Sequence, residues 1–113
     1  MSVTTHVLDI SAGRPAVGVR VALEAPDGDG GWRRLGEGAT GGDGRLSGLV
    51  PADRRLAVGA HRLVFDTGAW FADQGVDAFY PEVSVVFEVA DPTQHFHVPL
   101  LLSPFGYSTY RGS

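Results

Sequence analysis

The chain has 113 residues, the length of one domain, and a formal net charge of −4, and all nine of its basic residues are arginine. Cysteine is absent, which excludes disulfides, thiolate metal ligands and a cysteine nucleophile. The arginines form no basic stripe of the kind that binds nucleic acid. The start "MSVTTHVLDI" lacks the basic and apolar regions of a signal peptide, and no apolar run reaches the ~18 residues of a membrane span. We therefore expect a single domain over residues 1–113, in the cytoplasm, with no nucleic-acid or membrane partner.

Short alternations of apolar and polar residues, broken by Gly, Pro and Asp about every ten positions, predict an antiparallel β-sandwich or barrel. Residues 3–9 alternate, so that Val3, Thr5 and Val7 share one face. Residues 17–24 place four apolar side chains on one face, and residues 32–40 form a weaker strand. The pair Asp43-Gly44 then favours a tight turn with positive φ, directly before Arg45.

The second half of the chain continues the pattern. Strands are expected at residues 61–67, 83–89 and 95–103, and a last strand near the C-terminus. Only residues 69–74 have a helical character, with Gly75 placed as a C-terminal stop. The prediction is an all-β protein of about eight strands and one short helix.

The segment "QHFHVPLLLS" departs from a plain sandwich strand. One face is apolar and belongs to the core, whereas the other carries His95, His97, Pro99, Leu101 and Ser103. The wet face of an antiparallel sheet is normally polar, so this face is expected to be covered by a ligand or by another subunit. Pro99 lacks a ladder donor, which predicts a local bulge or an unpaired register.

A second histidine occupies a similar place in the first strand. His6 lies on the side of residues 3–9 opposite the core residues, together with Thr4 and Leu8. If this strand lies beside residues 95–103, His6 and His97 come together. His61 is interpreted instead as a half-exposed structural residue, the usual role of an isolated strand histidine.

Two kinds of chemistry are compatible with these histidines. His95 and His97, at positions i and i+2, could bind zinc together with His6 and leave the fourth position open. Alternatively, a neutral imidazole could act as a general base with an arginine as its electrostatic partner. The spacing of the histidines in the sequence does not distinguish zinc binding from metal-free acid–base catalysis.

Four segments together resemble the transthyretin-related 5-hydroxyisourate hydrolases: "HVLDISAGRPAVGV", "GGDGRLSGL", "HRLVFDTGAWFADQGVDAFYPEVSVVF" and "HFHVPLLLSPFGYSTYRGS". The resemblance runs from about Thr5 to Ser113. Its most specific part is the ending Tyr-Arg-Gly-Ser, since true transthyretins share the preceding frame but not that ending. True transthyretins also differ at the positions of His6, Arg45 and His97.

The resemblance implies a transthyretin-like sandwich of two four-stranded sheets and a homotetramer that encloses a channel lined by the face of His97. It implies metal-independent hydrolysis of a ring amide of 5-hydroxyisourate to 2-oxo-4-hydroxy-4-carboxy-5-ureidoimidazoline, in urate degradation, without a cofactor. The implied catalytic residues are His6, Arg45, His97 and Ser113. His6, Arg45 and Tyr110 are expected to bind the substrate.

Within that assignment, either His6 or His97 could activate the water, with the other supporting the developing charge or donating the proton. Arg45 stays protonated and suits the oxyanion and the edges of a urate-like ring. Tyr110 offers a ring and a hydroxyl, and Ser113 a hydroxyl and a carboxylate. His95 is assigned a secondary role, and Arg111 a packing or ion-pair role away from Tyr110.

Three alternatives stay open from the sequence. One is a small-ligand carrier of the transthyretin type without catalysis. The second is a zinc-dependent hydrolase that uses His6, His95 and His97. The third is a carbohydrate- or peptide-binding module, which would need none of the terminal residues.

Overall fold

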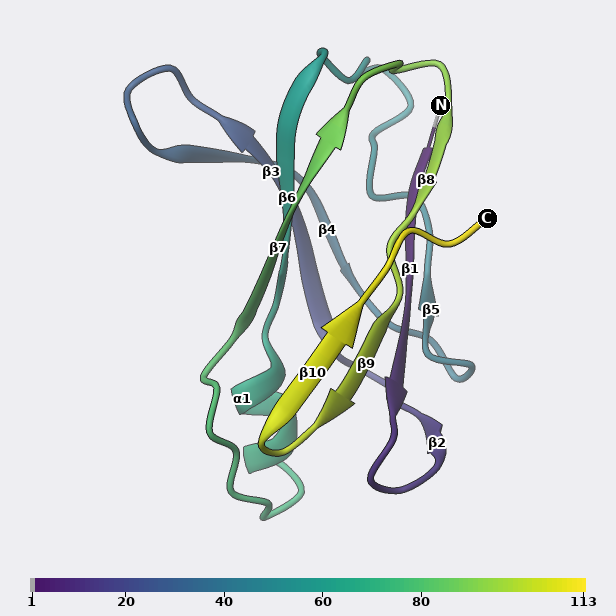
Figure 1. Ribbon diagram of the computed structural model, residues 1–113, viewed down its shortest axis with the longest axis vertical. Helices are drawn as coiled ribbons and strands as arrows, with labels where there is room; N and C mark the ends of the chain where they lie inside the picture. The colour runs from purple at the N-terminus through teal and green to yellow at the C-terminus, as the bar shows by residue number, and fades with distance from the viewer. Residues whose placement is uncertain (1) are drawn as a thin grey trace.

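The computed structural model describes residues 2–113 as two β-sheets packed face to face, with one short helix at the lower end of the view in Figure 1. The second sheet has the order β4 (Trp32–Ala39), β3 (Arg20–Pro26), β6 (Gly59–Phe65) and β7 (Val83–Val89), all antiparallel. The predicted β-sandwich is therefore confirmed.

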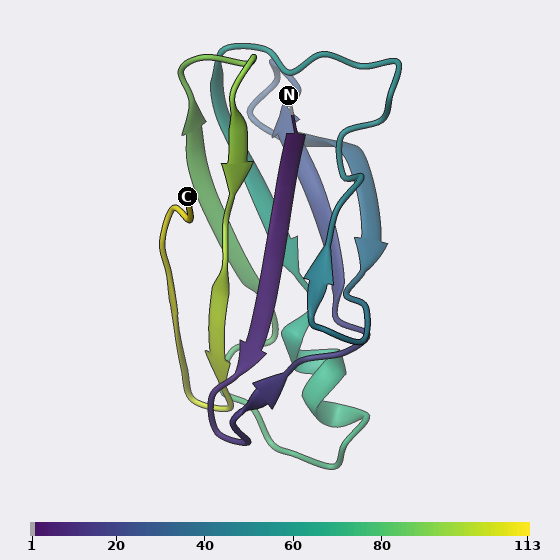
Figure 2. The same cartoon turned by 90° about the vertical axis from the view of Figure 1, so that its right-hand side faces the viewer.

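The first sheet is built around β1 (Ser2–Asp9). Its order is β10 (Gly106–Thr109), β9 (Leu100–Ser103), β1 and β2 (Arg14–Pro15). Two further strands, β5 (Arg45–Leu46) and β8 (His95–His97), also pair with β1. In Figure 2, β8 and β9 follow one edge of β1, and β2 and β5 follow the other.

The strand count differs from the expected eight in two sheets of four, because residues 2–113 form ten strands in sheets of six and four. The strand expected at residues 95–103 is divided into β8 and β9, and the short strands β2 and β5 pair with the other edge of β1. The sandwich is also not wholly antiparallel, because both β8 and β9 run parallel to β1.

The break between β8 and β9 falls at Val98-Pro99, so the predicted irregularity at Pro99 is confirmed. Val98 donates its N–H to the Thr4 carbonyl at 2.9 Å, whereas proline has no N–H to donate. The Pro99 carbonyl accepts a hydrogen bond of 2.7 Å from the Thr109 hydroxyl. Pro99 is buried, whereas His97 and Leu101, which the sequence assigned to the same face, are half-buried.

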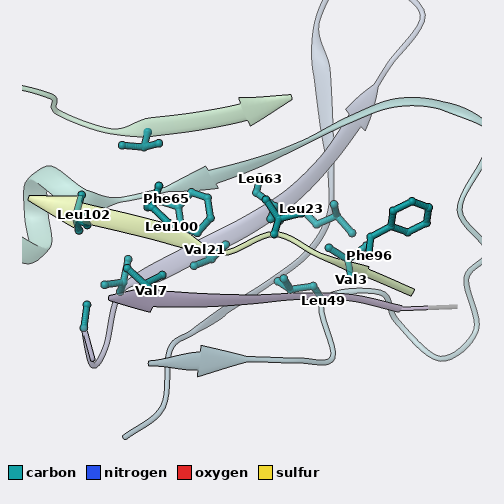
Figure 3. Packing of buried hydrophobic residues seen from close by; sticks show 14 of the residues in the cluster. Val3, Val7, Val21, Leu23, Leu49, Leu63, Phe65, Phe96, Leu100 and Leu102 are labelled. Carbon is teal, nitrogen blue, oxygen red and sulfur yellow. The ribbon is translucent and has the colours of Figure 1, made fainter. Parts of the chain in front are cut away.

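The core lies between the two sheets (Figure 3). From the first sheet come Val3, Val7, Phe96, Leu100 and Leu102, and from the second Val21, Leu23, Leu63 and Phe65. His61 joins this core with only 2 % of its surface exposed, so the expectation of a half-exposed side chain is wrong. Its Nδ1 donates to the Gly59 carbonyl at 3.1 Å, and strand alternation fixes the side chain inward with Leu63.

The helix α1 spans Thr67–Ala72 rather than the expected residues 69–74. It begins earlier because Thr67 and Phe71, one turn apart, both turn inward and are buried. Gly75 has φ of +68° and donates its N–H to the Ala72 carbonyl at 2.9 Å, which confirms it as the residue that ends the helical segment. At six residues, this helix is too short to cross a membrane, and the described residues contain no other helix that could.

Candidate active site

The outer face of β1 carries the first components of the site. Along β1 the even-numbered residues are half-buried and the odd-numbered ones buried, so Thr4 and His6 point away from the core. β8 lies parallel beside β1, with Thr4 opposite His97 and Ser2 opposite His95. Because paired residues share a face of the sheet, both histidines of β8 lie on the side of Thr4 and His6.

A glycine turn places Arg45 beside this face. In β5, Arg45 is the register partner of His6. Gly44, with φ of +78°, precedes it, and a Cβ there would lie 2.5 Å from the Val7 carbonyl oxygen, so only glycine fits. The Asp43 carboxylate accepts the Arg45 main-chain N–H at 3.0 Å and holds the turn. The turn predicted at Asp43-Gly44 is confirmed, with the positive φ on Gly44.

The C-terminal tail, residues 110–113, brings the last components. After β10 the tail crosses toward β8 in Figure 1, and the Gly112 N–H donates to the His97 carbonyl at 2.8 Å. Arg111 turns away from the site: its guanidinium bonds the Gln94 side chain at 3.2 Å and lies 4.9 Å from the Phe96 ring centroid. This agrees with the packing role expected for Arg111.

These elements enclose an open cavity of about 720 Å³. The polar and ionisable side chains that line it include Thr4, Asp43, Arg45, Ser47, His95, His97, Tyr110 and Ser113. The structure thus brings together Arg45, His97, Tyr110 and Ser113 from the predicted set.

His6 stands at the margin of the cavity. Its Nε2 donates to the Asp43 carbonyl at 2.8 Å, and it does not line the cavity itself. The ring packs against the turn, since a Cβ on Gly44 would lie 3.3 Å from His6 Cδ2. In this arrangement His6 supports the turn that carries Arg45.

His97 has the electrostatics of a base. Partial burial, then the positive charge of Arg45, then His95 and His6 lower the pKa of His97 below its ordinary value of 6.5. Each cause disfavours the imidazolium. The ring is therefore neutral near pH 7 and can accept a proton.

The three-histidine zinc site finds no support in the geometry. Within residues 2–113, no three His, Cys, Asp or Glu side chains are placed to share a metal ion. The His95 and His97 rings stack nearly parallel with centroids 6.4 Å apart, and His6 is bonded to a carbonyl instead.

Thr4 is a further polar residue of the site, and no motif in the sequence marks it. Its hydroxyl lies 2.8 Å from His97 Nδ1 and 3.2 Å from His95 Nε2. The alternation of β1 already placed Thr4 on the face of His6. The signal that was missing is the parallel register, which sets Thr4 opposite His97.

Fold and cavity together define a small β-sandwich protein with a polar site suited to acid–base chemistry on the outer face of one sheet. The sequence model described as "HIUase/Transthyretin family" matches residues 3–112. The chain belongs to this family.

Curated relatives carry the name 5-hydroxyisourate hydrolase. The one from Salmonella dublin is 46% identical over 110 residues, covering 97% of this chain and 79% of that protein. The one from Mus musculus is 46% identical, covering 97% of this chain and 93% of that protein.

Solved structures of both branches of the family superpose on the chain. The 5-hydroxyisourate hydrolase of Klebsiella pneumoniae gives a TM-score of 0.83 at 38% identity, covering 99% of this chain and 93% of that one. Sea bream transthyretin in complex with thyroxine gives a TM-score of 0.89 at 32% identity, and the match covers 97% of this chain and 93% of that one. The fold is thus common to hydrolase and carrier, and the side chains of the cavity must distinguish them.

Proposed function

We propose that this chain is a 5-hydroxyisourate hydrolase of urate degradation, acting as a single domain. It opens a ring amide of 5-hydroxyisourate to give 2-oxo-4-hydroxy-4-carboxy-5-ureidoimidazoline. The observation that carries the proposal is the pairing of Gly112 with His97, which brings Tyr110, Gly112 and Ser113 into one cavity with His97 and Arg45. The curated hydrolases at 46% identity support it.

His97 acts as the general base in this proposal. Its Nδ1 is engaged by Thr4, and no side chain or carbonyl of the described residues bonds its Nε2. The neutral Nε2 can therefore take a proton from a water that attacks the ring carbonyl. A histidine whose pKa is lowered from its ordinary value is mostly neutral, and so able to accept a proton, at neutral pH.

Arg45 stabilises the oxyanion that forms at the attacked carbonyl. Its guanidinium is a permanent cation, and its pairing with Asp43 is loose, at 4.0 Å between exposed side chains. The fork is therefore free to turn toward a substrate oxygen. His6, bonded to the Asp43 carbonyl, keeps this turn in place, and its direct contact with substrate stays a prediction.

Tyr110 and Ser113 bind and orient the substrate. Tyr110 is 58 % exposed, so its ring is open to stack on a flat heterocycle. Ser113 adds hydrogen-bonding groups at the opposite end of the tail segment. Their roles rest on their position in the cavity.

We also propose a homotetramer located in the cytoplasm. Large apolar side chains stay exposed at the edges and turns of the isolated chain: Ile10, Val17, Phe79, Val86, Phe105 and Tyr107. Val86 and Tyr107 belong to the edge strands β7 and β10, whose unpaired sides favour pairing with another copy of the chain. Light scattering of the purified protein tests the tetramer, and cell fractionation tests the location.

A carrier without catalysis is the second candidate, favoured by the TM-score of 0.89 to a transthyretin bound to thyroxine. It predicts ligand binding without turnover.

The deciding experiment follows freshly generated 5-hydroxyisourate by ultraviolet absorbance, with wild type and His97→Asn. We expect wild type to accelerate the decay and His97→Asn to be slower by roughly 10²-fold or more, the worth of a positioned acid–base group. If wild type does not accelerate the decay of 5-hydroxyisourate, the proposed hydrolase activity is wrong. If His97→Asn is as active as wild type, the assignment of His97 as general base is wrong.

A further inference from the structure

The Thr4 hydroxyl lies between the two histidines of β8. Thr4 Oγ1 is 2.8 Å from His97 Nδ1 and 3.2 Å from His95 Nε2. The parallel pairing of β1 with β8 creates this contact, because it sets Thr4 opposite His97 on one face of the sheet. A threonine hydroxyl has one hydrogen to donate and lone pairs to accept, so it can bond both rings only in a defined direction.

The hydrogen-bonded row continues to the surface. His95 Nδ1 is bonded to the Ser2 hydroxyl, and the side chains of this contact are exposed. The row Ser2, His95, Thr4, His97 therefore runs from solvent to the cavity, and we call it the relay row. The relay row ends inside the cavity at His97 Nε2, and no described residue forms a hydrogen bond to this nitrogen.

The single hydroxyl hydrogen allows two arrangements. In the first, Thr4 donates to His95 Nε2 and accepts from His97 Nδ1–H, which leaves His97 Nε2 bare and basic. In the second, His95 Nε2–H donates to Thr4, and Thr4 donates to His97 Nδ1, which puts the proton of His97 on Nε2. The first arrangement becomes the second when one proton enters at His97 Nε2, the hydrogens shift along the row, and one proton leaves from the Nδ1 side of His95.

We propose that Thr4 and His95 form a proton relay behind His97, which fixes its tautomer and carries away the proton that hydrolysis releases. The proposal deepens the proposed hydrolase function and rests on it. Thr4 and His95 act through His97 and are positioning residues, not catalytic ones.

The step balances in atoms and protons. The attacking water forms an O–C bond and gives one hydrogen to His97 Nε2. His97 passes its Nδ1 hydrogen to Thr4 Oγ1, and Thr4 passes its own to His95 Nε2. The water's second hydrogen ends on the leaving ring nitrogen as the C–N bond breaks, so the product is a carboxylate. His95 then releases one proton to solvent through its Nδ1 side.

The charges around His97 favour this export. The ionisable side chains around it are Arg45 on β5, Asp43 in the turn before β5, His6 on β1, His95 on β8 and Tyr110 of the tail. Arg45 disfavours an imidazolium at His97, which agrees with the lowered pKa of His97. His95 is exposed to water, where a positive charge is readily solvated.

The test compares Thr4→Val, which keeps the shape and removes the hydroxyl, with Thr4→Ser, which keeps the hydroxyl. We expect Thr4→Val to lower kcat by about 10- to 100-fold, because losing the relay removes part of the rate enhancement that a positioned acid–base group provides. KM is expected to change by less than about two-fold. Thr4→Ser is expected to restore most of kcat. His95→Phe, which keeps a flat ring without the nitrogens, is expected to lower kcat in the same sense.

A purely structural role for Thr4 gives a different pattern. It predicts that Thr4→Val and Thr4→Ser lose kcat equally and that both have a lowered Tm. This pattern, or an unchanged kcat in Thr4→Val, would show that the proposed relay is wrong.

Ring ¹⁵N chemical shifts measured by NMR test the relay without any substrate. We expect His97 of wild type at pH 7 to carry its proton on Nδ1, and Thr4→Val to lose this preference. The same tautomer mixture in both proteins overturns the relay even if the enzyme is active. Absence of turnover by wild type overturns the proposed function instead, and the NMR result still decides the tautomer.

Discussion

Gly112 and His97 are joined through their main chains, with the Gly112 N–H donating to the His97 carbonyl at 2.8 Å. A Cβ at position 112 would lie 2.5 Å from Cδ2 of the His97 ring. The tail can therefore pass beside the imidazole only because residue 112 has no side chain. The position of Tyr110 and Ser113 in the cavity depends on this close approach.

Gly112→Ala is expected to lower kcat by roughly 10-fold or more, because either the tail or the His97 ring must move, and misplacement by ~1 Å can be costly. Its Tm should change little, since the tail is on the surface. Gly106→Ala is the matched control: its Cβ would meet only the Ser103 hydroxyl, at an ordinary 3.7 Å. Steady-state kinetics of the two variants check the prediction, and equal activities contradict it.

Deletion of residues 110–113 is expected to lower kcat/KM by roughly 10²-fold or more through the loss of positioned substrate contacts. The fold should survive, because three of the four residues are exposed and β10 already ends at Thr109. Circular dichroism with the ultraviolet assay separates the effects. A truncated protein with full turnover would favour a site that does not use the tail.

The acid limb of the pH–activity profile should lie below the ordinary histidine pKa of 6.5, because burial and Arg45 lower the pKa of His97. Arg45→Gln removes the positive charge, so the pKa of His97 rises and the limb moves to higher pH. An NMR titration of the His97 ring follows the same change independently of turnover. A limb that moves to lower pH would contradict the assignment.

The lowered pKa of His97 also determines whether the fold gains or loses stability as the pH falls. The unfolded chain binds more protons at His97 than the folded protein does just below pH 6.5, so this group destabilises the fold as the pH falls through that range.

Chelator treatment is expected to leave turnover unchanged within about two-fold. The His95 Nε2 and His97 Nδ1 nitrogens are already directed to Thr4, and His6 Nε2 to the Asp43 carbonyl, so the three rings do not converge. Activity is measured after dialysis against a chelator, with added Zn²⁺ as the control. A loss restored by zinc would revive the three-histidine site.

The sequence predicted the components of the sandwich well where local pattern determines structure. The alternation of β1 placed Val3 and Val7 in the core and His6 outside, as observed. Asp43-Gly44 marked the turn before Arg45 because a positive φ there requires glycine. Pro99 marked the break between β8 and β9 because it cannot donate to the ladder.

What was missed depends on contacts between distant segments. The burial of His61 follows from the packing of the second sheet on the first, which an isolated histidine in the sequence does not reveal. The bridge from Thr4 to both histidines needs the register of β1 against β8. The place of His6 at the cavity margin follows from its bond to the Asp43 carbonyl, a contact between side chain and main chain without a motif.

The parallel pairing of β1 with β8 and β9 also sets an order of events during synthesis. The Thr5 hydroxyl bonds the Val98 carbonyl at 2.6 Å across 93 positions of sequence, so this neighbour leaves the ribosome long after Thr5 does. The second sheet, made of β3, β4, β6 and β7, needs only the middle of the chain. The nascent strand β1 must therefore keep its apolar face without its partners β8 and β9 until residues 95–103 have been translated, which is the interval in which chaperones would meet it.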